Sequence, residues 1–160
     1  MKKRIFALLL SVAMTASLLT GCGSDDGELD SYRSAVESFY DDVVEINDNI
    51  NAIDAESEKA AEDLLSELDD LNSIFKDFAD LDVPREYAAI EDLADEAASL
   101  MDEAVALYHS SFNEGTFNDF SAGMAYEKYC RAIVRINYIG DILQGKTIEG
   151  DNINVIYEEE

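Results

Sequence analysis

Apolar residues recur at helical spacing through most of this chain. Between Leu29 and Ile53 the steps from one apolar position to the next alternate between three and four residues, which is typical of a helix packed at a small crossing angle. Three further stripes follow. The four sets are Leu29, Tyr32, Val36, Phe39, Val43, Ile46, Ile50 and Ile53; Ala61, Leu64, Leu68, Leu71, Phe75 and Phe78; Ile90, Leu93, Ala97, Leu100, Ala104 and Leu107, widened by Ala94, Met101 and Tyr108; and Ala122, Tyr126, Tyr129, Ile133, Ile136, Gly140 and Leu143.

Capping residues mark the ends of these helices. Asp54 is expected to cap the second helix, and Pro84 suits the first turn of the third. Gly115 is expected to stop the third helix, Thr116 with Asp119 to start the fourth in a box-like arrangement, and Gly145 to close it. The pattern predicts an all-α fold, an up-down-up-down four-helix bundle over residues 29–144.

The N-terminal segment has the layout of a cleaved secretory signal. Lys2, Lys3 and Arg4 precede an uncharged run from Ile5 to Leu19. As a helix that run would be about 22 Å long, short of the ~30 Å hydrocarbon core of a bilayer. We therefore predict a signal peptide over residues 1–21 and not a membrane span.

The end of that segment, Leu19-Thr20-Gly21-Cys22, resembles the lipobox of bacterial lipoproteins. The resemblance implies a diacylglycerol on the Cys22 thiol, cleavage before Cys22, and a lipid-anchored protein on the extracytoplasmic face of the cell membrane. Residues 22–28 would form a polar, flexible tether. The alternative is an ordinary secretory signal followed by an incidental cysteine.

The body of the chain also resembles a known group. Residues 81–129, "LDVPREYAAIEDLADEAASLMDEAVALYHSSFNEGTFNDFSAGMAYEKY", are similar to the helical ectodomains of small, largely uncharacterised surface lipoproteins of Gram-positive-type bacteria. The resemblance implies a helical bundle at the cell surface and assigns no functional residues.

The charge of the chain limits its partners. Removing residues 1–21 takes away three of the eleven basic residues and none of the 36 acidic ones, so the remaining 139 residues carry a net charge of −28. Such a charge repels nucleic acid and anionic lipid, and we expect no nucleic-acid partner. Residues 145–160 form an acidic C-terminal tail, whose apolar "INVIY" could dock on the bundle, form a strand or remain disordered.

Residues that could support catalysis or metal binding are scarce. His109 is the sole histidine, and we interpret it as a boundary residue near the end of the third helix. No Glu-x-x-His pair or zinc spacing is present, and the acidic clusters lack the glycine of a calcium loop; we interpret them as solvated faces, with weak divalent binding as the alternative. We expect no catalytic residues, no metal site, and no cofactor besides the diacylglycerol. Cys130, left without a partner by Cys22, is expected to be a buried packing residue, the alternative being a reactive thiol.

Two groups of residues on the fourth helix are candidate contacts. Lys128, Arg131 and Arg135 lie on one face, about opposite its apolar stripe, and would either pair with acidic neighbours or contact an anion or a partner's carboxylate. Tyr126 and Tyr129, with Tyr108 and the intruding Asn137, would either pack in the core or line a cleft between the third and fourth helices.

These observations favour a non-catalytic binding or interaction module that presents an acidic helical surface to an envelope protein or peptide. The alternative is a lipoprotein that senses a small ligand or a cation through the tyrosine cleft or the acidic faces. An enzyme is the third hypothesis.

Overall fold

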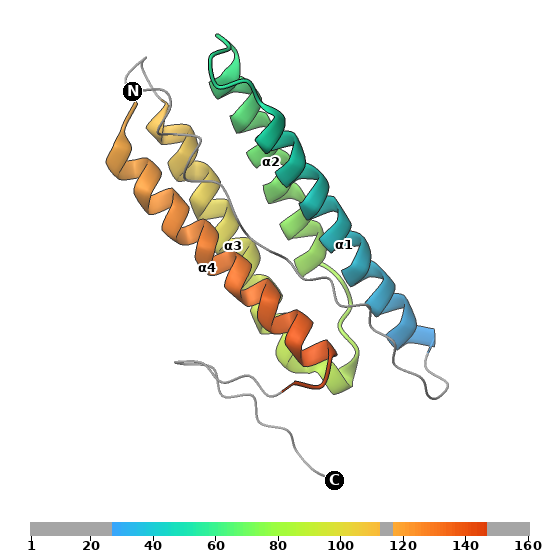
Figure 1. Cartoon of the computed structure of the whole chain (residues 1–160). Helices are drawn as coiled ribbons and strands as arrows, with labels where there is room; N and C mark the ends of the chain where they lie inside the picture. The colour runs from blue at the N-terminus through green and yellow to red at the C-terminus, as the bar shows by residue number, and fades with distance from the viewer. Residues whose placement is uncertain (1–26, 113–116, 147–160) are drawn as a thin grey trace.

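The protein is a bundle of four antiparallel helices (Figure 1). The computed structural model describes residues 27–112 and 117–146. Within them the helices are α1 (Gly27–Ala52), α2 (Ala60–Ala79), α3 (Ala88–Ser111) and α4 (Asp119–Leu143), with a short 3-10 helix, η3 (Arg85–Tyr87), before α3. The predicted all-α, up-down-up-down bundle is confirmed. Predictions for the signal peptide, Cys22, Gly115, Thr116 and residues 147–160 lie outside the described residues.

Helices α1 and α2 form the first hairpin and bury the predicted stripes. On α1 the buried positions run from Tyr32 to Ile50 at the expected spacing, while Leu29 and Ile53 are only half-buried. On α2 the stripe from Leu64 to Phe78 is buried, and Ala60 is buried where Ala61 was expected. Full burial of a large apolar side chain contributes roughly 1.5–3 kcal/mol, so these stripes are the main support of the hairpin.

The turn between α1 and α2 differs from the prediction. Asp54 does not cap α2, which begins six residues later at Ala60. Instead the Asp54 carboxylate accepts a hydrogen bond from the Glu56 amide at 3.0 Å, and its carbonyl accepts one from the Ser57 amide at 2.9 Å. The side chain therefore closes a local turn, because an aspartate bonds its own backbone two residues on as readily as it caps a helix. Helix α1 also begins two residues before the predicted Leu29, so Gly27 and Glu28 belong to it and not to a tether.

Pro84 ends the connection between the two hairpins, but it does not lie in the first turn of α3 as predicted: it precedes η3, and α3 begins four residues later at Ala88. Pro84 is buried, with φ −57° and ψ 142°, and its carbonyl accepts the Tyr87 amide at 2.8 Å. Its fixed φ and missing N–H suit the residue just before a helical turn. The chain then passes through η3 into α3.

Helices α3 and α4 are the most closely packed pair. Small residues repeat every seven positions on both facing surfaces: Ala97 and Ala104 on α3, and Ala125 and Ala132 on α4, each at most 1% exposed. Because the distance between helix axes depends on the side chains between them, these alanines allow a close approach. The stripe predicted for α4 missed Ala125, Ala132 and Ile139 and wrongly placed Tyr126 in the core.

Both ends of α4 are capped. The Asn118 side chain accepts hydrogen bonds from the Phe120 and Ser121 amides, both at 3.1 Å, so the cap of α4 is Asn118, and Asp119 is the first residue of the helix. At the other end Gly145 adopts φ 69°, its amide bonds the Ile142 carbonyl, and the Lys146 amide bonds the Asp141 carbonyl. This paired bonding is the Schellman arrangement, and it confirms Gly145 as the stop.

A tyrosine links the two hairpins. Tyr40 of α1 donates its hydroxyl to the Ile136 carbonyl of α4 at 2.8 Å. A Cβ added at Gly140 would lie 2.8 Å from that hydroxyl, so the glycine provides the space that the tyrosine fills. Gly140 therefore makes room for the Tyr40 side chain. Burial raises the pKa of Tyr40 to about 12; the charge of Asp141 adds to the rise, and a backbone hydrogen bond at Gly140 opposes it.

The helix ends are divided between the two ends of the bundle. The start of α1, η3 and the end of α4 lie together, and the α1–α2 turn lies at the opposite end (Figure 1). Among the described helices, none combines the length and the apolar character that crossing a membrane requires.

Candidate binding groove

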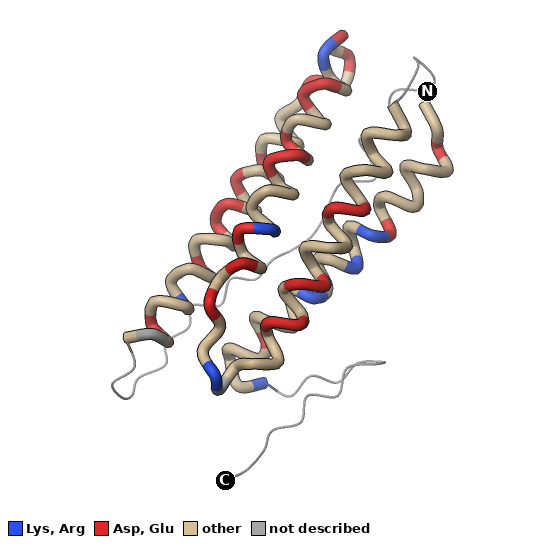
Figure 2. The backbone as a smooth tube through the Cα atoms, turned by 180° about the vertical axis from the view of Figure 1, so that it is seen from behind, with Lys and Arg blue, Asp and Glu red and all other residues tan. Residues whose placement is uncertain are grey.

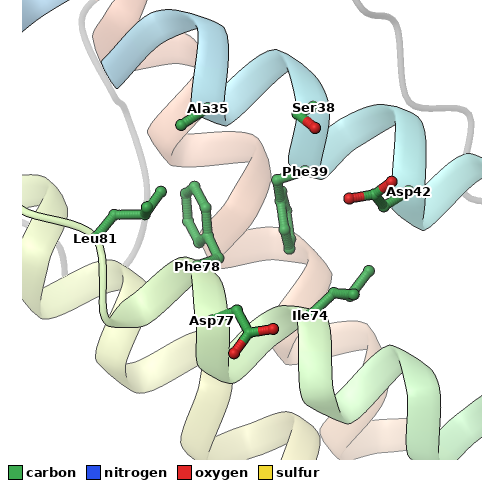
Figure 3. A pocket seen from close by; sticks show the side chains of 8 residues that line it. All are labelled: Ala35, Ser38, Phe39, Asp42, Ile74, Asp77, Phe78 and Leu81. Carbon is green, nitrogen blue, oxygen red and sulfur yellow. The ribbon is translucent and has the colours of Figure 1, made fainter. Parts of the chain in front are cut away.

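An open groove lies between α1 and α2 (Figure 3). Helix α1 contributes Ala35, Ser38, Phe39 and Asp42, and α2 with the residues after it contributes Ile74, Asp77, Phe78 and Leu81. Its volume is about 200 Å³.

Two aromatic rings form the floor of the groove. Phe39 and Phe78 stack with ring centroids 4.2 Å apart, and each is only 4% exposed. Phe75 meets Phe39 edge to face, with ring centroids 5.2 Å apart. Offset stacked and edge-to-face pairs add about 0.5–1.5 kcal/mol beyond area burial, so this floor is a well-supported surface.

The register of the hairpin places residues from the two helices opposite each other. Asn49 donates a hydrogen bond to the Glu67 carboxylate at 3.2 Å, and from this pair each step back along α1 is matched by a step forward along the antiparallel α2. Phe39, ten residues before Asn49, meets Phe78, eleven residues after Glu67, in the same antiparallel register. The groove therefore lies between the middle of α1 and the end of α2.

Carboxylates border this floor. Asp42 and Asp77 are exposed, one on each helix, and Ser38 is exposed beside them. Glu45, one turn after Asp42, and Asp70, two turns before Asp77, are exposed on the same helix faces. Within the part of the chain that the structure describes, none of these four carboxylates has a salt bridge.

Basic residues are few on these two helices: Arg33 on α1 and Lys76 on α2. Figure 2 shows acidic positions along both α1 and α2, with few basic ones. Lys76, a basic residue of α2, points to α3, where it pairs with Asp102. Asn72 also donates to Asp102 at 3.0 Å, and these hydrogen bonds, first from Asn72 and then from Lys76, lower the pKa of that carboxyl.

The predicted basic stripe of α4 is mostly engaged inside the bundle. Lys128 forms an ion pair with Glu103, and Arg135 with Glu96 at 2.9 Å, both across the α3–α4 boundary. The interpretation as pairs with an acidic neighbouring helix is confirmed for these two. Their expected position opposite the core was wrong, because both side chains are half-buried beside α3. Arg131 is exposed and has no salt bridge among the described residues.

The predicted tyrosines come together, but they pack in the core. Tyr108 is 5% exposed and Tyr129 is 6% exposed, so the packing interpretation is confirmed for these two. Burial raises the pKa of Tyr129 to about 12, with Cys130 and Tyr126 adding to the rise, and it raises the pKa of Tyr108 further. The Tyr108 hydroxyl is buried and has no hydrogen-bond partner in the described structure.

The remaining members of that group lie at the surface. Tyr126 is half-buried, stacks on Tyr129 at 6.5 Å between centroids, and contacts Cys130, which raises the pKa of Tyr126. Cys130 is half-buried against the core and not fully buried as expected. Asn137 is exposed; it does not intrude beside Ile133, because the core face of α4 is turned toward Ala132 and Ile139.

His109 lies at the edge of the bundle, as expected. Its Nε2 lies 2.8 Å from an Asp69 oxygen on α2, with both side chains about half exposed. The pair joins α2 to α3. Among the described residues, no group of three histidine, cysteine or carboxylate side chains is arranged to hold a metal ion.

The groove was missed by the sequence analysis, although a signal for it existed. Phe39 and Phe78 were placed correctly on the buried stripes of two helices predicted to be antiparallel neighbours. Which residues of the two helices meet depends on the structure of the turn between them, which the stripes do not specify. The open space between the helices depends on how Leu81 and Ile74 pack, and periodicity carries no information on that.

Comparison with known proteins adds no family. No protein-family model, no curated protein and no solved structure matches this chain.

Proposed function

We propose that this chain is a lipid-anchored binding module of the cell envelope, which acts without catalysis and holds a basic protein or peptide partner on its acidic α1–α2 face. The observation that carries the proposal is the set of exposed carboxylates on that face that have no basic partner in the described residues. Unpaired surface charge of one sign attracts a partner of the other sign and speeds its association.

The anchor supports the same proposal. Cys22 lies five residues before Gly27, so the first turn of α1 would sit within about 17 Å of the lipid. Phe39 lies twelve residues into α1, about 18 Å along its axis. The groove would then face the space just outside the membrane, where envelope proteins are within reach.

The anchor is tested by labelling. A Cys22→Ala variant is expected to take up no radiolabelled fatty acid and to leave the membrane fraction, because the thiol is the acceptor. A Cys130→Ala variant is the matched control and keeps both label and membrane association. Label in the Cys22→Ala protein would contradict the assignment.

The binding function is tested by capture. The full chain, purified from membranes in zwitterionic detergent, is used to retain proteins from solubilised envelopes of the source cell, beside an unrelated acidic protein of matched charge. We expect retention of a basic protein above that control, and weaker retention at high salt, because screening shortens the range of surface charges. Equal retention by both proteins would refute the proposal.

A further inference from the structure

The α1–α2 groove is too small for a whole ligand and suited to one side chain. Sites for small molecules enclose about 300–1,000 Å³, whereas this groove has about 200 Å³. At protein interfaces, in contrast, a single apolar anchor side chain of one partner fills a small pocket of the other. The volume therefore favours an anchor side chain of a larger partner.

The chemistry of the groove selects that anchor and its neighbours. The floor is apolar, with Phe39 and Phe78 at its centre and the half-buried Ile74 beside them (Figure 3). Covering such a surface is worth about 25 cal/mol per Å² removed from water. The rim carries the carboxylates of Asp42 and Asp77, one on each side. An apolar side chain flanked by basic ones matches both features.

Two other occupants are disfavoured by charge. The C-terminal segment of this chain contains the apolar Ile153–Tyr157 run, but three glutamates follow it directly, and their charge would meet the carboxylates of the rim. A second copy of the chain brings a net charge of −25, or −28 without residues 1–21, against the same face. Like charges brought together across an interface are costly, so the occupant is a different, basic molecule.

We propose that the groove binds a basic amphipathic helix of an envelope protein, which inserts one apolar side chain over Phe39 and Phe78 and sets basic side chains against Asp42 and Asp77. This assignment rests on the proposed binding function and names the partner's chemistry. Because Glu45 and Asp70 extend the acidic border by one and two turns, a helix with lysine or arginine spaced three and four residues apart fits along the hairpin.

The test is a titration with a synthetic helical peptide that carries lysines around a central leucine. The full chain in zwitterionic detergent is titrated with this peptide, with the same peptide bearing alanine in place of leucine, and with octylammonium alone. Loss of the leucine is expected to weaken binding about tenfold, because most of the apolar contact disappears. Octylammonium binding as tight as that of the peptide would overturn the proposal in favour of a small-ligand site.

Variants of the protein separate the rim from the floor. Asp42→Asn with Asp77→Asn is expected to weaken peptide binding about five- to tenfold at low salt, as two exposed ion pairs are lost. Asp92→Asn with Asp95→Asn on α3 is the matched control, with the same change of charge and less than a twofold effect. Ser38→Phe fills the groove from an exposed position without removing any core atom, and is expected to abolish the advantage of leucine over alanine. Circular dichroism verifies that each variant is folded.

The outcomes distinguish this assignment from the broader function. If the envelope partner is still captured by the Ser38→Phe and double-asparagine variants, the binding function stands and the groove is not its site. Equal effects of the groove pair and the control pair would show attraction by net charge alone and overturn the assignment. Tighter peptide binding after deletion of residues 147–160 would show that the chain's own tail occupies the groove.

Discussion

The Tyr40 hydroxyl lies against Gly140, and this contact predicts that Gly140→Ala changes the free energy of unfolding in opposite directions with and without that hydroxyl. Glycine inside a helix costs about 1 kcal/mol relative to alanine, so Gly140→Ala should ordinarily stabilise α4. Here the added methyl group would lie 2.8 Å from the Tyr40 hydroxyl, which holds a 2.8 Å hydrogen bond to the Ile136 carbonyl. The tyrosine must withdraw.

The size of the effect follows from what the withdrawal costs. Loss of the Tyr40 hydrogen bond lowers the free energy of unfolding by about 1 kcal/mol, and exposure of part of the Tyr40 ring lowers it by about 1 kcal/mol more. Against the gain of about 1 kcal/mol in helix propensity, Gly140→Ala is expected to lower the free energy of unfolding by about 1 kcal/mol. In a Tyr40→Phe background the hydroxyl is gone and the next tyrosine atom, Cζ, lies 3.7 Å away, which is ordinary contact. There the same substitution should raise the free energy of unfolding by about 1 kcal/mol.

The assay is urea unfolding of the four members of this double-mutant cycle, followed by helical circular dichroism. The expected coupling between Tyr40 and Gly140 is about 2 kcal/mol, within the range for residues in contact. Stabilisation of equal size in both backgrounds would refute the reasoning, because it would mean that the hydroxyl does not occupy the space at Gly140.

Three further predictions concern stability. Tyr108→Phe is expected to leave the free energy of unfolding unchanged or to raise it by up to about 1 kcal/mol, because the buried hydroxyl has no partner in the described structure; a loss above 1 kcal/mol in urea unfolding would contradict this. Asn118→Ala should lower the free energy of unfolding by about 1 kcal/mol in the same assay, because the two cap bonds are lost, whereas Asn118→Asp should keep most of the stability that the cap provides. The pKa values of Tyr32, Tyr40 and Tyr129, each raised to about 12 chiefly by burial, predict loss of stability at alkaline pH. The folded state keeps these protons, whereas the unfolded state loses them near pH 10. The free energy of unfolding is therefore at its full value below about pH 10 and falls by about 1 kcal/mol per tyrosine by about pH 11. A free energy of unfolding that stays flat between about pH 9 and 11 would refute this prediction.

The sequence predicted the fold well where one interaction dominates. The heptad spacing on α1 identified its core from Tyr32 to Ile50, because burial of large side chains outweighs other terms there. Gly145 was identified as a stop because its positive φ strongly favours glycine.

It failed where several local choices have similar energies. Asp54 can cap a helix or close a turn at about equal cost, and Asn118, which caps α4, belongs with threonine to the residue types that favour this role. On α4 the predicted stripe followed the large apolar residues and therefore included Tyr126. The close α3–α4 contact instead selects alanines, whose small size gives a weak hydrophobic signal.

The candidate site was predicted only in part, for a related reason. That the protein presents an acidic surface follows from composition, but which carboxylates stay unpaired depends on packing. Three of the basic residues pair with carboxylates of α3: Lys128 and Arg135 reach it from α4, and Lys76 reaches it from α2. The four carboxylates around the groove have no salt bridge among the described residues, and only the three-dimensional arrangement reveals this.

Site-specific photo-crosslinking in the intact envelope tests the central claim most directly. A photoreactive amino acid is placed at Ser38 in the groove and, as a control, at Asp92 on α3, both exposed. The account predicts an adduct with a basic envelope protein from Ser38, absent from Asp92 and suppressed when Asp42→Asn and Asp77→Asn are added. The same adducts from both positions, or a Ser38 adduct that persists after the rim is neutralised, would contradict it.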